Sequence, residues 1–526
     1  MQIEEMELYG RKNTKVFAGE RPKTIGEVLQ NSLEKFPDKA AVVTEERALT
    51  YSELDARSTV IAANLQKHCS VEKGDRVAVI VGNRYHFPLI VFACVKLGAI
   101  MVPINVKLTA DEIGYIIGHS DVKALISEAD HFYKIEAIQE QQPQIIPTED
   151  HIFIIDGVNT FETLLQPSNP TTKVDIDELD PAFILYTSGT TGRPKGAVLS
   201  HINVIHSLIN FQLTFQTTPD LKTLIAVPMF HVTGLVGQLL HMIYIGGTAY
   251  SMERYQNKIY IEYILTYKIN FVFNVPTIFI MMATEEEFKN NSFDFVTKVA
   301  FGGAPIYQQT FNMLKEVFPN AELHNAYGST ETTSPATLMP VSYSESKGTS
   351  VGPAVPVADI KIVNQNGEEC PIGEIGELYI KGPMVIKEYW RNPEANETSF
   401  TDGYWHSGDM GYVDEDGYFY ICDRKKDMIN RAGEKVFSIE VEDMLKKHEY
   451  IKEAAVVGIP DPLYGERVKA FVVIDHFTEA DVPSIKEHCL KHLAKFKVPE
   501  LYEFLDELPR NASGKILKYT LKNRRN

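Results

Sequence analysis

The ten residues Thr187–Gly196 (TSGTTGRPKG) constrain this chain more than any other stretch of its sequence. They follow the apolar segment Ala182–Tyr186, which predicts a buried strand. Three glycines in the run allow tight turns and a close approach of backbone N–H groups to a ligand. Four hydroxyl side chains and Lys195 add donors and a fixed positive charge, which suits the oxygens of a triphosphate. We therefore predict a phosphate-binding loop, although neither the Walker A spacing nor the dinucleotide fingerprint is present.

The order of strand-like and helix-like segments indicates the fold class. Up to about Val351, apolar runs alternate with amphipathic stretches, which favours largely parallel sheets covered by helices. Beyond that point short strands take over, with hairpin signals at Asn364–Gly367 and Asp414–Gly417. The expected strands are Arg76–Val81, Ile100–Val102, Ala182–Tyr186, Leu224–Val227, Phe271–Phe273, Lys298–Phe301, Ala454–Ile459 and Lys469–Ile474, and the expected helices are Phe87–Leu97, Ser438–His448 and Ser484–Leu493.

These segments predict an α/β protein of more than one domain, because 526 residues exceed one ordinary domain. We expect a large N-terminal domain, residues 1–423, of mixed and parallel sheets flanked by helices, with a β-rich subdomain. The charged stretch Asp423–Asp427 is expected to join it to a small α+β domain, residues 427–526.

The composition argues against several classes of protein. A net charge of −18 disfavours a general binder of nucleic acid or of anionic membranes. Five scattered cysteines without C-x-x-C spacing indicate neither a disulfide framework nor a zinc site, which fits a reducing cytoplasm. The acidic start Met1–Glu7 does not resemble a signal peptide, and apolar stretches such as Phe271–Ala283 are too short for an integral membrane segment. Neither a G-x-S-x-G elbow nor an H-E-x-x-H helix supports a hydrolase or a metalloprotease.

The run Thr187–Gly196 resembles the phosphate loop of the adenylate-forming superfamily, which contains acyl-CoA synthetases, adenylation domains of peptide synthetases and beetle luciferases. The resemblance extends from Leu49–Leu54 to Ser513–Lys515, with several motifs in the family's order, and is strongest to bacterial fatty-acid or acyl–CoA ligases. Because the chain is acidic and ATP and CoA are polyanions, the site must gather cations, for which Arg193, Lys195, Arg424, Lys515 and a metal ion are candidates. The resemblance implies that ATP contacts Thr187, Ser188, Gly189, Thr190, Thr191, Gly192 and Lys195.

A second motif, Asn325–Glu331 (NAYGSTE), resembles the Y-G-x-T-E segment that lines the family's nucleotide site. By that resemblance, Asn325 bonds the adenine amino group and Tyr327 packs on the ring. Thr330 reaches the α-phosphate, and Glu331 holds Mg²⁺, a hard cation that prefers oxygen ligands. Gly303 and Ala304 are expected to let the backbone approach the adenine face.

The remaining nucleotide contacts are expected from the later part of the chain. Asp409, in Tyr404–Asp409, resembles the family aspartate that accepts hydrogen bonds from both ribose hydroxyls. Arg424 matches the arginine that contacts ribose or phosphate. Lys515, in Pro509–Lys515, matches the family's catalytic lysine, a movable cation that meets the negative charge building at the α-phosphate.

The same resemblance implies a mobile C-terminal domain. Lys426 matches the hinge residue about which that domain rotates, so that one orientation presents Lys515 and the other opens a tunnel for a thiol. Gly433 is expected to lie near the path of the CoA pantetheine.

An acyl pocket is expected beside the segment Pro228–Gly234. Adenylation domains for amino acids usually carry an aspartate where this chain has His231, so an amino acid substrate is disfavoured. The residues expected to line the pocket are His231, Phe273, Val275, Gly302 and Gly328.

Together these motifs predict an ATP-dependent carboxylate–CoA ligase that forms an acyl-AMP and then an acyl thioester. Medium- or long-chain fatty acids are the favoured substrates, because no carboxylate for binding an amine is evident; aromatic and short-chain acids are the alternatives. A stand-alone acyl-AMP ligase that loads a carrier-protein phosphopantetheine is the main rival. A luciferase-type oxidase is more remote, and a nucleotide-binding regulator without turnover is opposed by the presence of both Glu331 and Lys515.

Overall fold

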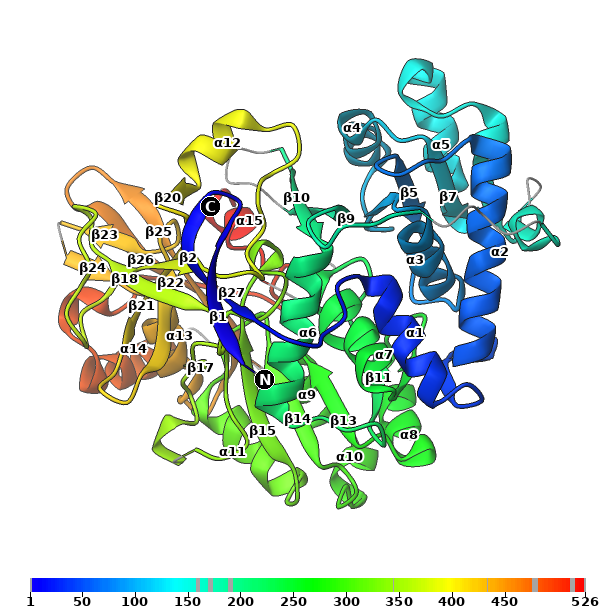
Figure 1. Cartoon of the computed structure of the whole chain (residues 1–526). Coiled ribbons are helices and arrows are strands. Elements are labelled where there is room, and N and C mark those ends of the chain that lie inside the picture. The colour runs from blue at the N-terminus through cyan, green and yellow to red at the C-terminus, as the bar shows by residue number, and fades with distance from the viewer. Residues whose placement is uncertain are drawn as a thin grey trace.

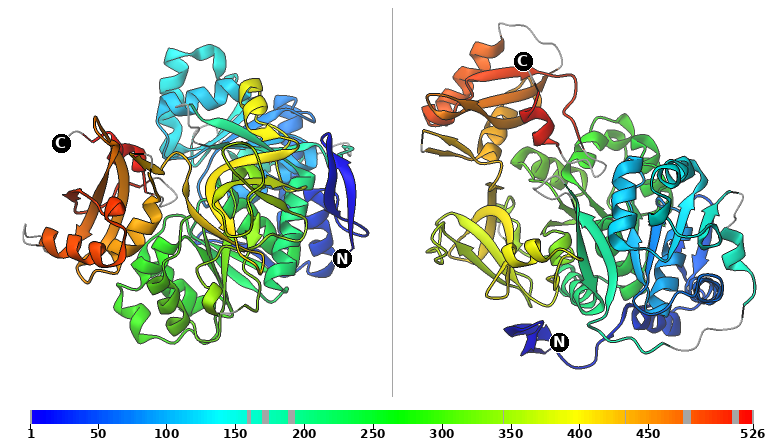
Figure 2. Two further views of the ribbon diagram at one scale, coloured as in Figure 1. Left: turned by 90° about the vertical axis from the view of Figure 1, so that its left-hand side faces the viewer. Right: turned by 90° about the horizontal axis from the view of Figure 1, so that it is seen from above.

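A computed structural model describes residues 2–157, 161–168, 174–187, 193–343, 345–432, 434–474, 481–510 and 516–524. Two largely parallel sheets with helices between and around them are joined to an antiparallel sheet and to a smaller C-terminal sheet (Figures 1 and 2). The predicted α/β class, with a large N-terminal part and a small C-terminal α+β part, is confirmed. In the described part of the chain, no helix combines the length and the apolarity needed to cross a bilayer.

The first sheet has the strand order β10-β9-β6-β5-β7-β8 and is parallel except for the β9–β10 pair. Its two faces are buried differently, because side chains alternate along each strand: Val77 and Val79 enter the core shared with the second sheet, whereas Ala78 and Ile80 pack under α4 and α5. The strands are β5 (Arg76–Ile80), β6 (Ile100–Pro103), β7 (Ala124–Glu128), β8 (Ile152–Ile155), β9 (Pro181–Thr187) and β10 (Lys195–Ser200), and the helices are α2 (Tyr51–Cys69), α3 (His86–Leu97), α4 (Ala110–Ser120) and α5 (Ala129–Gln141).

The second sheet has the order β16-β15-β14-β13-β11-β12-β3-β4 and is parallel between its two antiparallel edge strands. The apolar residues of α8, α9, α10 and α11 cover its outer face. The strands are β3 (Ala40–Val43), β4 (Ala48–Thr50), β11 (Lys222–Ile225), β12 (Thr248–Ser251), β13 (Phe271–Asn274), β14 (Lys298–Gly302), β15 (Glu322–Tyr327) and β16 (Thr337–Leu338), and the helices are α8 (Asn257–Tyr267), α9 (Pro276–Met282), α10 (Glu286–Asn290) and α11 (Gln308–Val317).

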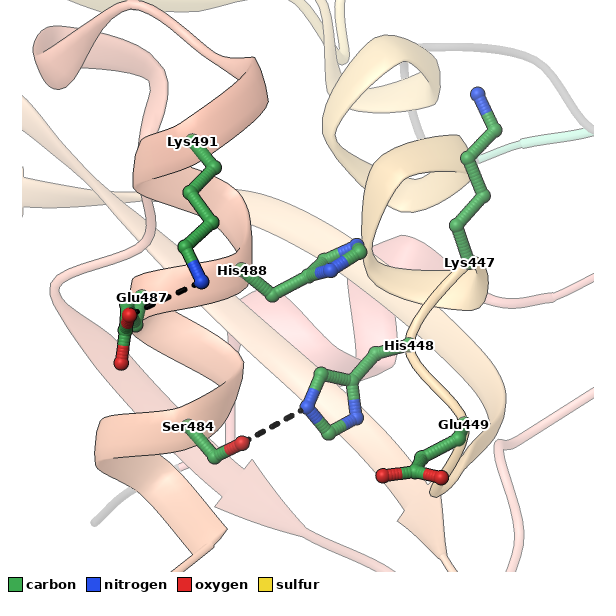
Figure 3. A pocket seen from close by; sticks show the side chains of 7 residues that line it. All are labelled: Lys447, His448, Glu449, Ser484, Glu487, His488 and Lys491. Atoms are coloured by element: carbon green, nitrogen blue, oxygen red, sulfur yellow. Dashed lines mark hydrogen bonds and ion pairs between the residues drawn. The ribbon is translucent and has the colours of Figure 1, made fainter.

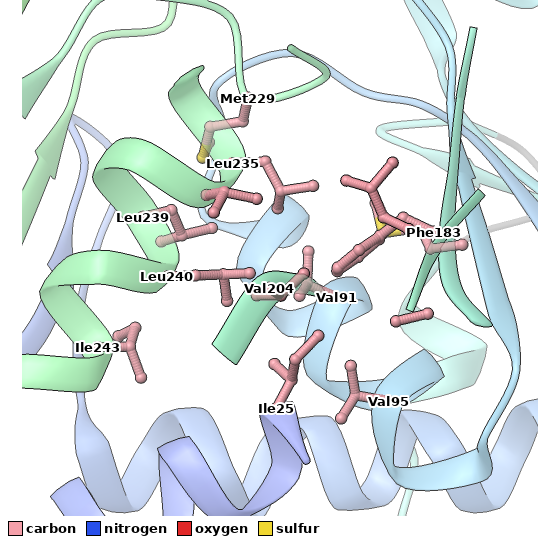
Figure 4. Packing of buried hydrophobic residues seen from close by; sticks show 14 of the residues in the cluster. Ile25, Val91, Val95, Phe183, Val204, Met229, Leu235, Leu239, Leu240 and Ile243 are labelled. Atoms are coloured by element: carbon pink, nitrogen blue, oxygen red, sulfur yellow. The ribbon is translucent and has the colours of Figure 1, made fainter. Parts of the chain in front are cut away.

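The main hydrophobic core lies between these two sheets. Side chains from both sheets and from the helices α1 (Ile25–Lys35), α3, α6 (His201–Phe215) and α7 (His241–Ile245) meet there, together with the π-helix η4 (Thr233–Leu240) (Figure 4). Phe183 of β9 points into this cluster and is fully buried. Packing of this core therefore fixes β9, and with it the start of the predicted phosphate loop, relative to the second sheet.

The antiparallel sheet has the order β17-β22-β21-β19-β18, with β20 beside β21. The Asp414–Gly417 hairpin signal is confirmed, since it joins β21 to β22. The elements are β17 (Gly352–Pro353), β18 (Asp359–Val363), β19 (Gly376–Lys381), α12 (Pro393–Thr398), β20 (Phe400–Thr401), β21 (Tyr404–Val413) and β22 (Tyr418–Arg424).

The C-terminal sheet has the order β24-β23-β26-β25, with β27 parallel to β26. Helices α13 and α14 pack on it around a small core of its own. The elements are β23 (Ile429–Arg431), β24 (Glu434–Val436), α13 (Ser438–Lys446), β25 (Ile451–Asp461), β26 (Gly465–Ile474), α14 (Asp481–His492), β27 (Leu501–Phe504) and α15 (Lys518–Lys522). The domain boundary at residues 423–427 and the hinge at Lys426 remain predictions.

The expected strands and helices are present, with ends that differ by up to four residues. One of these differences has a clear cause. The segment Leu224–Val227 was expected to be a strand, but β11 ends at Ile225. The reason is a side chain from a distant segment: the amide of Asn83 donates to the carbonyl of Val227 at 3.2 Å and accepts from the N–H of Met229 at 2.8 Å. These two hydrogen bonds direct the chain out of the sheet just before η4.

A β-hairpin, β1 (Ile3–Leu8) and β2 (Arg11–Phe17), precedes α1. Two buried histidines bind the end of the hairpin and the start of α1. The N–H of Phe17 donates to Nε2 of His206 at 3.1 Å, and the N–H of Ile25 donates to Nδ1 of His201 at 3.2 Å. Burial lowers the pKa of His206 to about 3 and that of His201 to about 4. Both acceptors are therefore neutral imidazoles at physiological pH.

Replacing Phe183 by alanine is expected to lower the free energy of unfolding of the N-terminal part by about 3–5 kcal/mol, because a cavity opens in a close-packed core. Urea unfolding measures this loss. The control Tyr133→Ala, at a side chain that is 61% exposed, is expected to change little. Equal losses in the two variants would contradict this account of the core.

Acid is expected to destabilise the fold through its buried histidines. Because the folded pKa values of His201 and His206 lie below the ordinary value of 6.5, the unfolded chain binds their protons first as the pH falls. The stability that these two neutral histidines contribute to the free energy of unfolding is complete above about pH 6.5 and is lost as the pH falls from there toward about pH 4. Between these pH values, the free energy of unfolding of His206→Gln should change with pH less steeply than that of the parent, by the slope that corresponds to about one proton. The control His68→Gln changes an exposed histidine and should keep the slope of the parent. An unchanged slope in His206→Gln would refute the assignment.

Candidate functional site

The ends of the predicted phosphate loop are fixed by strand pairing. Thr187 closes β9 and lies opposite Lys195, the first residue of β10. Five of the predicted ATP contacts, Ser188, Gly189, Thr190, Thr191 and Gly192, lie outside the described residues. The Thr187 hydroxyl donates to Oε1 of Glu331 at 3.2 Å, so the loop begins beside the carboxylate that we predict to hold Mg²⁺.

Glu331 is a buried carboxylate with a defined set of contacts. It lies in the short helix η5 (Thr330–Thr332), just after β15, and its side chain is hydrogen-bonded to Thr187 and to Tyr389. Both hydroxyls donate to Oε1, and the described residues supply no donor to Oε2. A carboxylate held by one oxygen and open at the other fits a hard cation such as Mg²⁺, which prefers oxygen ligands. Thr330, the first residue of η5, is partly exposed next to it.

Tyr389 is a site residue that the sequence analysis missed. Its hydroxyl donates to Glu331 at 3.1 Å and accepts from Nε1 of Trp405 at 3.2 Å, and its ring faces Nζ of Lys195 at 5.1 Å. Burial raises the pKa of this phenol well above its ordinary value, so it remains a donor. Tyr389 belongs to a segment that runs along β10, with the N–H of Trp390 bonded to the carbonyl of Gly196 at 2.7 Å. No local sequence pattern marks it, since its role depends on pairing with residues some 190 positions away.

Asp409, Arg424 and Tyr327 form a second polar group. Strand pairing sets Asp409 of β21 opposite Arg424 of β22, and the guanidinium Nε lies 2.5 Å from Oδ1. The Tyr327 hydroxyl donates to Oδ2 at 2.8 Å. The Asp409 charge raises the pKa of Arg424, whereas burial is the main cause of the raised pKa of Tyr327. Each carboxylate oxygen keeps further acceptor capacity, which is what two ribose hydroxyls require.

The two polar groups are parts of one site. Tyr327 ends β15, and four residues later the same segment carries Glu331. The negative charge of Glu331 also contributes to the raised pKa of Arg424. The structure therefore gathers Thr187, Lys195, Tyr327, Glu331, Asp409 and Arg424 in one region.

The residues predicted near adenine lie on neighbouring strands. Gly302 of β14 is paired with Ala326 of β15, and a Cβ on Gly302 would come within 2.3 Å of the Ala326 carbonyl, so this position requires glycine. Gly303 follows with φ +76° and is exposed, with Ala304 partly exposed beside it. The amide nitrogen of Asn325 donates to the carbonyl of Ser350 at 2.9 Å. Its carbonyl oxygen remains an acceptor, as an adenine amino group would need.

Most residues of the predicted acyl pocket also cluster. Phe273 lies near the end of β13, opposite Ala300 of β14, and Val275 directly follows β13. A Cβ on Gly303, the residue after β14, would lie 3.6 Å from the Val275 side chain. A Cβ on Gly237 of η4 would lie 3.3 Å from the Phe273 ring and 3.6 Å from the Ser334 hydroxyl. A Cβ on Gly328 would overlap the Ser334 carbonyl, so Gly328 lies in the same region.

His231 lies just before η4, and its N–H donates to the carbonyl of Pro228 at 3.0 Å. Burial lowers its pKa to about 4, so the ring is neutral at physiological pH. Its Nε2 has no hydrogen-bond partner among the described residues. Among the described residues, no hydrogen bond or ring contact joins His231 to Phe273 or Val275.

The C-terminal part reaches this region through Arg510. Lys515 and Gly433 lie outside the described residues, and Lys426 follows β22. Arg510 and Ile516, which flank the lysine loop, pair as an antiparallel bridge. The Arg510 guanidinium donates to the Thr277 hydroxyl of α9 at 3.3 Å, two residues beyond Val275. Nearby, Nζ of Lys446 lies 3.6 Å from the centroid of the Tyr307 ring.

A separate hollow of about 310 Å³ lies between α13 and α14 (Figure 3). It contains none of the predicted site residues, and some of its polar groups bond each other: Lys491 pairs with Glu487 at 3.0 Å, and His448 Nε2 lies 3.2 Å from the Ser484 hydroxyl. The lining residues are Lys447, His448, Glu449, Ser484, Glu487, His488 and Lys491.

The fold and the gathered nucleotide-type site define an adenylate-forming enzyme. Comparison with known proteins supports this: the model of the AMP-binding enzyme family matches residues 29–390, and that of the AMP-binding enzyme C-terminal domain matches residues 440–515. The chain therefore belongs to the AMP-binding enzyme family, among its AMP-forming acid–thiol ligases.

Relatives and a solved structure are similar along nearly the whole chain. The fatty acid–(acyl-carrier-protein) ligase ScoC of Streptomyces coeruleorubidus is 34% identical, covering 93% of this chain and 94% of ScoC. The 2-succinylbenzoate–CoA ligase of Bacillus licheniformis is 33% identical, covering 94% of this chain and 98% of that protein. The structure of O-succinylbenzoate coenzyme A synthetase (MenE) from Bacillus subtilis in complex with ATP and magnesium ion is similar with a TM-score of 0.83 and 29% identity, covering 94% and 99% of the two chains.

The variant Asp409→Asn is expected to weaken AMP binding by about ten- to a hundredfold, because a charge-assisted hydrogen bond contributes about 1.5–3 kcal/mol. Titration calorimetry measures the Kd. The control Asp414→Asn changes a carboxylate that is paired with Lys347 at 2.6 Å elsewhere on the same sheet, and it should leave AMP binding unchanged. Equal affinity in Asp409→Asn and the parent would refute the ribose role.

Proposed function

We propose that this protein joins a carboxylic acid to the thiol of CoA in two steps. A carboxylate oxygen attacks the α-phosphorus of ATP, the bond to the leaving pyrophosphate breaks, and an acyl-AMP forms. The CoA sulfur, as thiolate, then attacks the acyl carbonyl, and AMP leaves with the electron pair of the broken C–O bond. The observation that carries the proposal is the meeting of Thr187, Glu331 and Lys195 at the end of a glycine-rich loop, beside the Asp409–Arg424 pair.

The roles of individual residues follow from their chemistry. Glu331 would hold Mg²⁺ through its open oxygen, and the ion, when bound, offsets phosphate charge. Lys195 and Arg424 supply further positive charge within an acidic protein. Lys515 would stabilise the charge that builds between carboxylate and α-phosphate. The contact of Arg510 with Thr277 supports this role, because it holds one end of the lysine loop beside the predicted acyl pocket.

For the acid, we propose a neutral apolar carboxylic acid, with medium- and long-chain fatty acids first and aromatic or short-chain acids as alternatives. The apolar side chains of Phe273 and Val275 and the neutral state of His231 support an acid without an amino group. ScoC is named for a fatty acid and two other relatives for 2-succinylbenzoate, so an acid panel has to include both kinds. Release of AMP in the presence of CoA, measured for each acid, identifies the substrate.

A carrier protein is the alternative acceptor, and the name of ScoC favours including it. In that case the acyl group would pass to a phosphopantetheine thiol on the carrier. Thioester formation with CoA compared with a phosphopantetheinylated carrier separates the two. The cytoplasmic location remains a prediction from the sequence.

The variant Lys515→Ala is expected to slow acyl-AMP formation by about a hundredfold or more, because it removes charge stabilisation from the transition state. Thioester formation from supplied acyl-AMP should be largely unaffected. Rapid-quench assays of each half-reaction measure the two rates. The control Lys522→Ala removes a nearby lysine, paired with Glu466 at 3.1 Å, and should affect neither rate. Equal losses in both half-reactions of Lys515→Ala would contradict the assigned role.

A further inference from the structure

The N-terminal hairpin lies before the residues that match the family model, which begin at position 29. Its strands β1 and β2 are joined by Tyr9 and Gly10, both with positive φ, as in a tight hairpin turn. The two views of Figure 2 show the hairpin on the side of the molecule opposite to the C-terminal sheet. Any effect of the hairpin on chemistry must therefore pass through the N-terminal part.

Arg11, the first residue of β2, is buried and binds main-chain carbonyls. Its guanidinium donates to the carbonyl of Ile386 at 2.7 Å and, more weakly, to those of Lys387 at 3.3 Å and Val385 at 3.4 Å. No carboxylate among the described residues forms an ion pair with it. Burial lowers its pKa to about 10, so it stays charged at neutral pH. A buried cation is costly unless it is well hydrogen-bonded, and these three carbonyls are its compensation.

The stem of Arg11 is also enclosed. The guanidinium lies 4.9 Å from the centroid of the Phe400 ring. Gly403, with φ +82°, lies so close that a Cβ there would come within 2.9 Å of the Arg11 side chain. The position therefore suits an arginine held in one conformation.

The segment whose carbonyls accept hydrogen bonds from Arg11 also binds Glu331. The N–H of Ile386 donates to the main-chain carbonyl of Glu331 at 2.9 Å, and the Tyr389 hydroxyl donates to the Glu331 carboxylate at 3.1 Å. Arg11 thus binds the carbonyls of residues 385–387, and the main chain of Glu331 binds the N–H of Ile386. Tyr389 also brings its ring to Lys195, so the same segment touches both charged groups at the phosphate loop.

A second contact ties the hairpin to the same place. The Tyr9 hydroxyl lies 2.6 Å from the Ser200 hydroxyl at the end of β10. Ser200 bonds Asn203, whose amide donates to the carbonyl of Pro383 at 2.6 Å. The hairpin therefore fixes β10 and the segment 383–390 relative to each other.

We propose that Arg11 is a positioning residue for the metal and phosphate end of the site: it fixes segment 383–390 and, through Tyr389, sets the Glu331 carboxylate and the Lys195 ammonium. This inference rests on the proposed role of Glu331. Tyr327, Asp409 and Arg424, which form the adenosine end of the site, make no hydrogen bond to segment 383–390 among the described residues. The segment does touch their sheet at Trp405, four residues before Asp409 on β21, so AMP binding should depend on Arg11 much less than MgATP binding does.

The test compares two ligands in calorimetry with the full chain. In Arg11→Met, which keeps an apolar stem but lacks the donors, the Kd for MgATP is expected to rise at least about tenfold, while the Kd for metal-free AMP changes less than about twofold. Tyr389→Phe should show the same pattern. The double variant should lose less than the product of the two single losses, because both act through one segment.

Arg21→Met is the matched control. Arg21 is also buried in the N-terminal arm, but it pairs with Glu178 at 2.7 Å and donates to the carbonyl of Phe17 at 2.8 Å. This variant should lower stability without changing the ratio of the MgATP and AMP affinities. Arg11→Lys keeps the charge with fewer donors, so its Kd for MgATP should lie between those of the parent and Arg11→Met. If Arg11→Met does not fold, Arg11→Lys provides the test.

Equal weakening of MgATP and AMP in the Arg11 variants would overturn the proposal, since a general loss of structure would produce it. An unchanged Kd for MgATP in the Arg11 variants, with a loss in Tyr389→Phe, would overturn it as well. A parent chain that binds MgATP but forms no acyl thioester would refute the proposed reaction, and the comparison of ligands would still decide the role of Arg11.

Discussion

The contact of Thr187 and Tyr389 with one oxygen of the buried Glu331 carboxylate is the interaction on which the rest of the site depends. It joins the end of β9, the turn after β15 and the segment beside β10. A buried carboxylate is costly unless hydrogen bonds or a cation compensate it. Two hydroxyl donors meet part of that requirement. Oε2 accepts no hydrogen bond from the described residues, which leaves it available to the cation that we propose.

Because each of these groups comes from a different layer, the site forms only when the large part of the protein is packed. The core between the two parallel sheets fixes β9 against β15, and the antiparallel sheet presents Asp409 and Arg424 from paired positions on β21 and β22. Glycines occupy places where a side chain would collide with main chain, as at Gly302 beside Ala326 and Gly328 beside Ser334. The site is thus a product of close packing between elements.

The sequence was enough to predict what depends on local patterns. The alternation of apolar segments predicted the parallel sheets. The resemblance of the motifs to those of the adenylate-forming superfamily predicted that Thr187, Glu331, Asp409 and Arg424 meet in one site. Contacts made by single residues from distant segments could not be predicted in this way. Asn83 binds the main chain where β11 ends, two residues before the expected end. Tyr389 donates to the Glu331 carboxylate, and Arg11 donates to the main chain of the segment that contains Tyr389. None of them stands in a local pattern, since each acts through main-chain or side-chain groups that only the folded chain brings near.

The most direct measurement of the central claim is the exchange of labelled pyrophosphate into ATP, because it reports acyl-AMP formation before any thiol is involved. If Glu331 and the phosphate loop form one site for Mg-ATP, exchange will require a carboxylic acid and Mg²⁺ and will be lost in Glu331→Gln. Exchange that persists undiminished in Glu331→Gln would contradict the account, as would its absence from the parent with every acid in a broad panel.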